Sequence, residues 1–278
     1  MGGVRVRFLL PATLLLGACS GWDWHVPGYT AGDGAMDAGA DASDGALACS
    51  GSPVTVPIAT NGDDGNYTIA APKSNWWQNF PSGGLNGTAD DEVGIYAGLD
   101  AYVSKVAYFR FVLPFALESE ADVESAHLEL WGLGEDGMQI GEPSKRRIDI
   151  YLEDTADAAP VDVSDLNYEE DDADVPAVGY IPGPRTVLSN PVIWAFPDPD
   201  DWRFPALNRT ADIALLLRAL IAARGPLAAG AHVQFWFNYS ALDPSANTPE
   251  VDAQGMLIRI ADLTNPTGQP AQLVLCAR

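Results

Sequence analysis

The chain has 278 residues, and 47% of them are hydrophobic, which argues against general disorder and allows a sizeable core. It carries 38 Asp and Glu residues against 15 Lys and Arg residues, a formal net charge of −23 at pH 7. This charge argues against nucleic acid and anionic lipid surfaces as partners.

The first 18 residues have the features of an export signal. Arg5 and Arg7 precede an apolar run at residues 8–16, which is too short to cross a bilayer as a helix. The sequence "LGAC" that ends at Cys19 resembles the bacterial lipobox, in which small residues precede a cysteine that becomes diacylated. We therefore predict that residues 1–18 are a signal peptide and that Cys19 carries a lipid anchor. The alternative is a buried N-terminal helix. The lipid anchor predicts a bacterial cell-envelope location, at the outer membrane or the cell surface.

Residues 19–48 have the composition of a flexible linker. The segment is rich in Gly, Ala and Asp and shows no apolar period after Tyr29. We expect an acidic spacer that lifts a single folded domain, residues 49–278, off the membrane.

The cysteines divide into one anchor and one pair. If Cys19 carries lipid, Cys49 and Cys276 remain in an exported, oxidising compartment. This predicts a disulfide between them, which requires the first and last strands of the domain to lie close together. Two unrelated buried thiols are the alternative.

From residue 50 onward, short apolar segments alternate with clusters of Gly, Pro, Asn and Asp, a layout typical of an antiparallel β-sandwich. In "VAYFRFVLP", Phe109, Phe111 and Leu113 fall on one side of the expected strand and Tyr108 and Arg110 on the other. The same period of two recurs in three further segments, "SAHLELW" (125–131), "RIDIYLE" (147–153) and "HVQFWFNY" (232–239). Four alternating segments predict an all-β fold.

One segment has helical spacing instead. The sequence "IALLLRALIAARGP" (213–226) repeats apolar residues at helical intervals, with Thr210 or Asp212 as candidate caps and Gly225-Pro226 as the end. We expect one short amphipathic helix that covers an edge or end of the sandwich. Residues 153–205 show little periodicity, which indicates a functional or mobile excursion with short strands near 186–188 and 192–195.

The order of these segments resembles that of the DNRLRE-type carbohydrate-binding modules. The similar stretches cover about residues 57–260 and are "TNGDDGNYTI", "EVGIYAG", "KVAYFRFVLP", "DVESAHLELWG", "RRIDIYLED", "LNRTADIALLLRAL", "VQFWFNY" and "PEVDAQGMLIRI". The resemblance implies a jelly-roll β-sandwich that attaches to polysaccharide or another cell-surface glycan.

Sugar binding calls for flat aromatic faces with planar polar groups beside them. Trp131 and Trp236 both fall on the polar side of their expected strands. If the two strands are neighbours, they form an aromatic platform; if a loop or the helix covers the two rings, they are packing residues. The candidate carbohydrate-binding residues are His127, Glu129, Trp131, Gln234, Trp236 and Asn238. A second candidate is the loop "NWWQNF", with Trp76, Trp77 and Phe80.

The acidic clusters offer weak metal candidates. Calcium takes carboxylate oxygens from irregular loops, and the clusters are Asp63 and Asp64, and Asp90, Asp91 and Glu92. Neither has a specific spacing, so we expect surface solvation and assign no metal or cofactor, while structural calcium stays an alternative.

The sequence contains no recognisable catalytic set. The three histidines form no metal-binding pair, and no nucleophile elbow or phosphate-binding loop occurs. We therefore expect a monomeric, non-catalytic, glycan-binding lipoprotein. A structural or adhesive envelope protein that binds another protein is the competing hypothesis. A polysaccharide-degrading enzyme with paired carboxylates is a third.

Overall fold

A computed structural model describes residues 49–72, 84–86, 90–97, 101–133, 147–162, 185–196, 201–238, 257–266 and 268–278. The predicted signal peptide, Cys19, the linker over 20–48 and the loop with Trp76, Trp77 and Phe80 lie outside the described residues.

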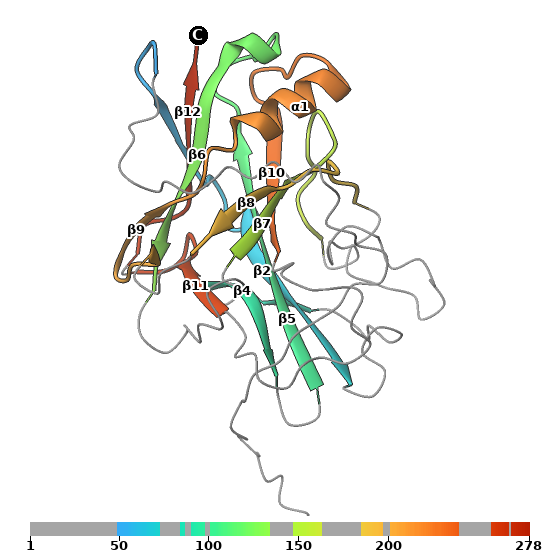
Figure 1. Cartoon of the computed structure of the whole chain (residues 1–278), viewed down its shortest axis with the longest axis vertical. Helices are drawn as coiled ribbons and strands as arrows, with labels where there is room; N and C mark the ends of the chain where they lie inside the picture. Colours follow the sequence, from blue (N-terminus) through green and yellow to red (C-terminus); the bar gives the residue numbers. More distant parts are fainter. Residues whose placement is uncertain are drawn as a thin grey trace, which may run out of the picture.

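The described residues form an all-β sandwich with one α-helix (Figure 1). The strands are β1 (Val54–Pro57), β2 (Asp64–Pro72), β3 (Gly84–Asn86), β4 (Asp90–Ala97), β5 (Ala101–Val112), β6 (Val123–Gly132), β7 (Arg147–Leu152), β8 (Val192–Ala195), β9 (Ala206–Arg209), β10 (His232–Asn238), β11 (Leu257–Ala261) and β12 (Gln272–Ala277). The helix is α1 (Ala214–Arg224), and a 3-10 helix, η1 (Glu120–Asp122), precedes β6.

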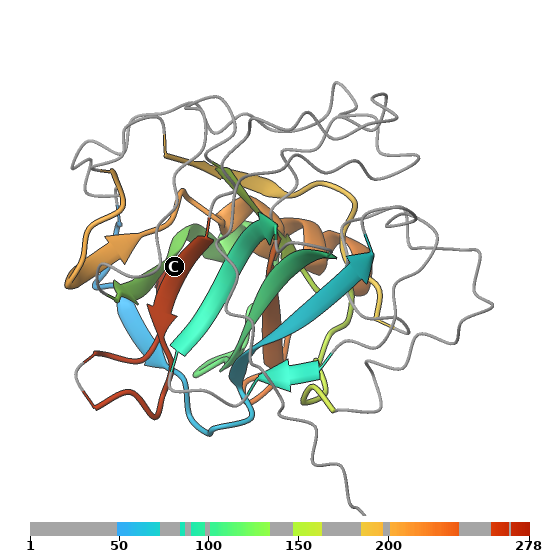
Figure 2. The same ribbon diagram turned by 90° about the horizontal axis from the view of Figure 1, so that it is seen from below.

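Two antiparallel layers are joined through β5. Hydrogen bonding follows the order β1-β12-β6-β11-β4-β5-β10-β7-β8, with β9 added to β6, β2 added to β5, and β3 added to β2. The first part of β5 pairs with β4 and the second part pairs with β10, while β2 follows the other edge. Seen from below, β11, β4, β5 and β2 lie side by side (Figure 2). Strands β4 and β10 pair with the same edge of β5, but with different stretches of it. The strands that continue from β4, namely β11, β6, β12 and β1, form one layer, which we call the β6 layer. The strands that continue from β10, namely β7 and β8, form the other, which we call the β10 layer.

The core lies between the layers and is built by the predicted alternation. Phe109 and Phe111 of β5 are buried and meet Phe237 and Phe235 of β10, with ring centroids 5.1 and 6.2 Å apart. Leu128 of β6 is also fully buried. The residues predicted to face the core do so, because only that register buries the apolar half of each strand.

The helix confirms the predicted amphipathic segment. Its apolar residues Leu216, Leu217, Leu220 and Ile221 are buried, and the helix contacts β6, η1 and β7. Figure 1 places it at the end of the sandwich where the C-terminus lies. Gly225 ends the helix with a φ of 86°, which favours glycine.

The two candidate caps have different roles. Asp212 Oδ1 accepts hydrogen bonds from Ala214 N at 2.9 Å and from Ala126 N at 3.0 Å, so it links the helix start to β6. Thr210 Oγ1 instead accepts from Leu128 N at 2.9 Å. Among the described residues, no helix has the length and hydrophobicity needed to span a membrane.

The predicted pairing of the domain's ends is confirmed. Cys49 and Cys276 form a disulfide, with their Cα atoms 5.7 Å apart. Strand β1 pairs with β12, so the first and last strands of the domain are neighbours, as the disulfide prediction required. Of the expected short strands in the excursion, residues 192–195 form β8, and Val187 forms an isolated bridge with Glu153.

Candidate functional site

The predicted binding residues lie in two different layers. His127, Glu129 and Trp131 belong to β6, whose neighbours are β12, β11 and β9. Trp236 belongs to β10, which lies between β5 and β7. A single platform carrying both tryptophans required neighbouring strands, and β6 and β10 are not paired. Trp236 is part of the hydrophobic core, whereas Trp131 is half-buried.

On β6, Glu129 forms an ion pair with an arginine from β9. Arg209 lies directly opposite Glu129, and its Nη2 is 3.3 Å from Glu129 Oε1. His127 is buried, with Nε2 3.5 Å from the same carboxylate oxygen. Burial lowers the pKa of His127, and the positive charge of Arg209 lowers it further, while Glu129 opposes both effects. Sequence reasoning missed Arg209, because the four residues of β9 carry no clear alternation.

Trp131 is half-buried against the loop that follows β11. A Cβ atom on Gly268 would lie 2.9 Å from Trp131 Cδ1, so this glycine packs directly against the indole ring. Contact with Gly268 covers part of the Trp131 ring, and Trp236 is the more covered of the two rings, with 0% of its surface exposed.

On β10, the predicted residues share a face with side chains from both neighbouring strands. Directly paired residues of antiparallel strands lie on the same face. Trp236 pairs with Tyr108 of β5 and with Tyr151 of β7, Gln234 pairs with Arg110, and Asn238 pairs with Asp149. We call this set the polar face: Tyr108, Arg110, Asp149, Tyr151, Gln234, Trp236 and Asn238. The alternation already placed Tyr108, Arg110, Asp149 and Tyr151 on the polar side of their strands, and the strand order was what the sequence lacked.

Trp236 is the centre of the polar face and is fully buried, with 0% of its surface exposed. Its ring centroid lies 5.5 Å from that of Tyr108, and the guanidinium carbon of Arg185 lies 5.9 Å from the Trp236 ring centroid. Nε1 donates a hydrogen bond to Glu153 Oε2 at 3.3 Å. The ring is thus held in one position by aromatic, cationic and hydrogen-bonding contacts.

The arginines at the polar face are paired. Arg110 forms an ion pair with Asp63 and donates from Nε to Ala158 O at 2.8 Å. Arg185 Nη1 lies 2.9 Å from Glu153 Oε2 and donates to Ala159 O at 3.0 Å. Arg185 comes from the aperiodic excursion, where the sequence carried no signal for it.

Two buried amides on the polar face have no hydrogen-bond partners among the described residues. Gln234 and Asn238 are 0% and 1% exposed, and in the described part of the chain neither the oxygen nor the nitrogen of either amide has a hydrogen-bond partner. Buried polar groups are nearly always paired, and leaving one unpaired costs about 1 to 3 kcal/mol. Two unpaired amides on one face, with Trp236 between them on β10, therefore offer hydrogen-bonding groups to a polar molecule.

Burial also perturbs the acids and phenols of this face. It raises the pKa of Asp149 to about 6, against the opposing charge of Arg147, whose Nε lies 3.8 Å from Asp149 Oδ1. Burial likewise raises the pKa of Tyr108 above its usual value, with the charges of Asp91 and Asp64 adding to the shift. Both groups stay uncharged over a wider pH range than in water, although Asp149 is ionised at pH 7.

The acidic clusters do not gather into a metal site in the described residues. Asp63 Oδ2 accepts hydrogen bonds from Thr60 N and Thr60 Oγ1 at 3.0 and 2.8 Å, and its Oδ1 is paired with Arg110. Asp64 Oδ2 accepts from Leu263 N at 2.8 Å, and burial raises the pKa of Asp64 to about 6. The expected surface solvation of Asp63, Asp64 and Asp91 is wrong, because all three are buried. The side chains of Asp90 and Glu92 lie outside the description.

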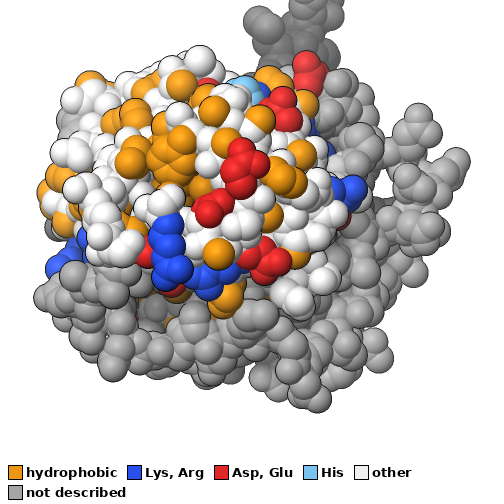
Figure 3. Space-filling view, turned by 90° about the horizontal axis from the view of Figure 1, so that it is seen from above, with side chains coloured by type: hydrophobic (Ala, Val, Ile, Leu, Met, Phe, Trp, Pro, Cys, Tyr) orange, Lys and Arg blue, Asp and Glu red, His pale blue; other side chains and the backbone are white. Residues whose placement is uncertain are grey.

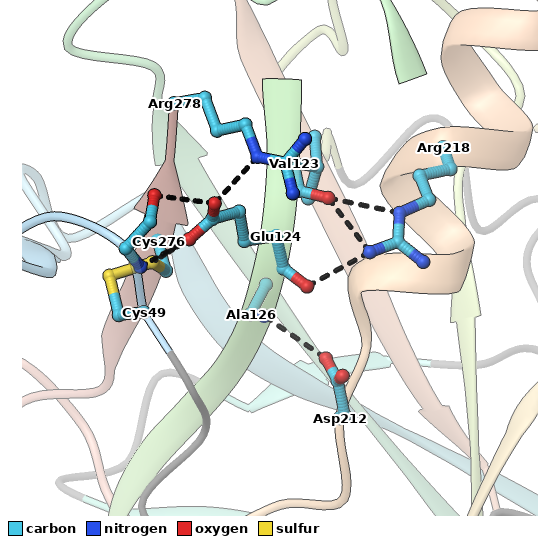
Figure 4. The surroundings of a disulfide bond; sticks show 9 residues. Cys49, Val123, Glu124, Ala126, Asp212, Arg218, Cys276 and Arg278 are labelled. Carbon is cyan, nitrogen blue, oxygen red and sulfur yellow. Dashed lines mark hydrogen bonds and ion pairs between the residues drawn. A yellow bond between two sulfur atoms is a disulfide. The ribbon is translucent and has the colours of Figure 1, made fainter. Parts of the chain in front are cut away.

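The end of the sandwich near the disulfide contains a hollow of about 520 Å³. Its lining residues are Cys49, Ser50, Glu120, Ala121, Val123, Glu124, Arg218 and Arg278. Glu124 accepts hydrogen bonds from Ser50 N and Arg278 Nε, both at 2.6 Å (Figure 4). Hydrogen bonds from Ser50 and Arg278 lower the pKa of Glu124 to about 2.

The residues that line this hollow hold the ends of the domain together rather than leaving groups available for a ligand. Seen from above, that end of the molecule mixes acidic, basic and hydrophobic side chains without a single dominant kind (Figure 3). Among the described residues, three potential metal-binding atoms come together only at Cys49, Glu124 and Cys276, and both sulfurs there belong to the disulfide. The polar face is the stronger candidate for ligand binding.

Comparison of the chain with protein-family models and with curated proteins finds no match. The functional inference therefore rests on the chemistry of the described residues.

Proposed function

We propose that this protein is a non-catalytic polysaccharide-binding lipoprotein of the bacterial cell surface. The sequence around Cys19 supports a lipid anchor, and residues 20–48 support a flexible tether. The two antiparallel layers with a single helix support a jelly-roll sandwich as the fold. The protein acts as a monomer, with its ligand on the polar face.

The observation that carries the proposal is the combination of Trp236 with the unpaired amides of Gln234 and Asn238. A sugar ring has an apolar C–H side that stacks on an indole and a rim of hydroxyls that both donate and accept hydrogen bonds. Gln234 and Asn238 lie two residues before and two residues after Trp236 on the same strand, so they flank the ring on one face. This arrangement matches the two kinds of contact that a sugar makes.

Ligand entry requires a local rearrangement. The Arg185 guanidinium lies over the Trp236 ring and forms an ion pair with Glu153. A sugar that stacks on the ring takes the place of this guanidinium, so binding displaces Arg185 and leaves the strands β5, β10 and β7 in position.

Affinity electrophoresis in gels that contain polysaccharide tests the proposal. Trp236→Phe keeps an aromatic ring at the centre of the polar face, but the ring is smaller and lacks the Nε1 donor. The affinity for the polysaccharide, read from the retardation, should therefore fall roughly three- to tenfold. Trp131→Phe is the matched control in the other layer and should leave retardation unchanged. Equal losses in both variants would contradict the site, and no retardation with any glycan would contradict the function.

Two further measurements address the tether and the absence of catalysis. Cys19→Ala should release the protein from the membrane fraction, and a variant that stays bound would contradict the lipid anchor. Incubation with each retarding polysaccharide should produce no new reducing ends. New reducing ends would favour the enzyme hypothesis, while pull-down of an envelope protein without glycan binding would favour the adhesive one.

A further inference from the structure

We infer that the polar face selects uncharged glycans and reads their hydroxyl groups through the amides of Gln234 and Asn238. The inference rests on the proposed function, because it names the class of ligand for the same site. It follows from which hydrogen-bonding groups on the face are already engaged and which are free.

Two of the described side chains without hydrogen-bond partners are amides, which are neutral and can both donate and accept. An amide offers a carbonyl oxygen as acceptor and an NH₂ group as donor, and a hydroxyl group can serve as either partner. Gln234 and Asn238 therefore match neighbouring hydroxyls, each of which donates one hydrogen bond and accepts another. A carboxylate only accepts, so it would satisfy the nitrogens of these amides and leave their oxygens unpaired.

Two of the three described arginines at the polar face form close ion pairs with carboxylates, and the Nε of the third, Arg147, has no hydrogen-bond partner within the described chain. Arg110 is paired with Asp63, and Arg185 with Glu153. Arg147 has the loosest partner, since its Nε lies 3.8 Å from Asp149 Oδ1, and its side chain is 29% exposed. An anionic sugar would have to displace one of these carboxylates and would then lie beside it, which places two like charges in a buried site.

The charge of the whole chain acts in the same direction. A formal net charge of −23 repels a polyanion during approach, although salt screens this effect beyond about 8 Å at physiological ionic strength. Uncharged polysaccharides meet neither obstacle.

The two amides should affect the stability of the ligand-free protein and its affinity for glycan in opposite directions. Their unpaired atoms destabilise the ligand-free protein, so replacing either amide by an apolar side chain of similar size should stabilise the protein and weaken binding together. A purely structural pair of residues would give the opposite result, because its replacement would lower stability and leave glycan affinity unchanged.

Isothermal titration calorimetry with short defined glycans tests the inference. The neutral ligands are cellohexaose, mannohexaose and xylohexaose, and the acidic ligands are hexagalacturonate and an oligoguluronate of similar length. The variants are Gln234→Met and Asn238→Leu, and Gln272→Met on β12 of the other layer is the matched control. Thermal unfolding of all four proteins is measured in parallel.

We expect at least one neutral glycan to bind and neither acidic glycan to do so. Gln234→Met and Asn238→Leu should each weaken that binding by roughly five- to tenfold and raise the melting temperature, while Gln272→Met should change neither. If one of the two variants fails to fold, the other carries the test alone.

The failures are distinguishable. Binding of acidic glycans as tight as that of neutral ones, lost in Arg147→Gln or Arg185→Gln, would overturn the ligand class and leave the proposed function intact. Unchanged neutral binding in both amide variants would overturn the role of the amides. Absence of binding by every glycan would overturn the proposed function itself.

Discussion

Asp149 is the buried carboxyl group through which the polar face should respond to pH. Burial raises its pKa from 3.8 to about 6, so the folded state holds the proton more tightly than the unfolded state between these values. Stability from this group is therefore fully present below about pH 4 and is lost as the pH rises to 6. Asp149→Asn should remove that loss and raise the unfolding free energy at pH 7 by about 2 to 3 kcal/mol. Urea unfolding at pH 4 and pH 7 measures the difference.

Asp157 provides a control of opposite sign. Its Oδ1 accepts a hydrogen bond from His232 N at 2.9 Å, and hydrogen bonds from His232 lower the pKa of this exposed carboxyl group. Asp157→Asn should therefore lower stability more at pH 7 than at pH 3. An Asp149→Asn variant with the same advantage at both pH values would contradict the role of burial.

At the scale of single residues, the sequence predicted which side of its strand a side chain lies on, but not which distant segments contact it. Alternation in "SAHLELW" and "HVQFWFNY" placed Trp131 and Trp236 on the side opposite the Leu and Phe residues of their strands, but Trp236 is nevertheless part of the hydrophobic core. Whether a ring on that side is open depends on segments that are distant in sequence, such as Gly268 against Trp131 and Arg185 over Trp236. No local pattern encodes those contacts or the strand order, so the sequence left open whether the two rings share one platform, and they lie in separate layers.

Arg218 fastens α1 to the start of β6. Its Nε donates to Val123 O at 3.0 Å, and its Nη2 donates to Val123 O at 2.8 Å and Glu124 O at 2.9 Å (Figure 4). Arg218→Met keeps the helix propensity and most of the apolar stem but leaves two strand carbonyls without this donor. We expect the unfolding free energy to fall by about 1 to 3 kcal/mol, measured by urea unfolding at pH 7.

Arg224 on the same helix is the matched control. Its guanidinium binds Asp154 at 2.7 and 2.8 Å, but the side chain is 46% exposed. Arg224→Met should lower stability much less than Arg218→Met does, because exposed ion pairs contribute little. Equal losses in the two variants would contradict the fastening role of Arg218.

Among the elements, those with a long, regular period were predictable. The helical spacing of Leu216, Leu217 and Leu220 located α1, and Gly225 marked its end. The strand β9 was missed because its four residues, "ALNR", are too few to show alternation. The pairing of β10 with the same edge of β5 that pairs with β4 was also beyond the sequence, since β5 and β10 are more than a hundred residues apart in the chain.

For the whole molecule, the cysteine pair gave the strongest long-range prediction. Assigning Cys19 to lipid left one possible partner for Cys49, and the disulfide with Cys276 then required the first and last strands to be close. The observed pairing of β1 with β12 meets that requirement. The layer order had no such covalent marker and could not be derived from alternation alone.

The disulfide should dominate the stability of the whole domain. It joins residues that are 227 positions apart, and closing so long a loop in the unfolded chain stabilises the folded state by about 5 kcal/mol in the chain-entropy model. Combined Cys49→Ser and Cys276→Ser should lower the unfolding free energy by about 2 to 5 kcal/mol. The sandwich should still form at 25 °C, because Ser50 and Arg278 continue to hold Glu124 and β1 continues to pair with β12. Guanidinium unfolding monitored by tryptophan fluorescence measures the loss, and the reduced wild-type protein should match the double variant. Coincident curves for the oxidised wild type and the double variant would show that the bond adds nothing to the contacts around it.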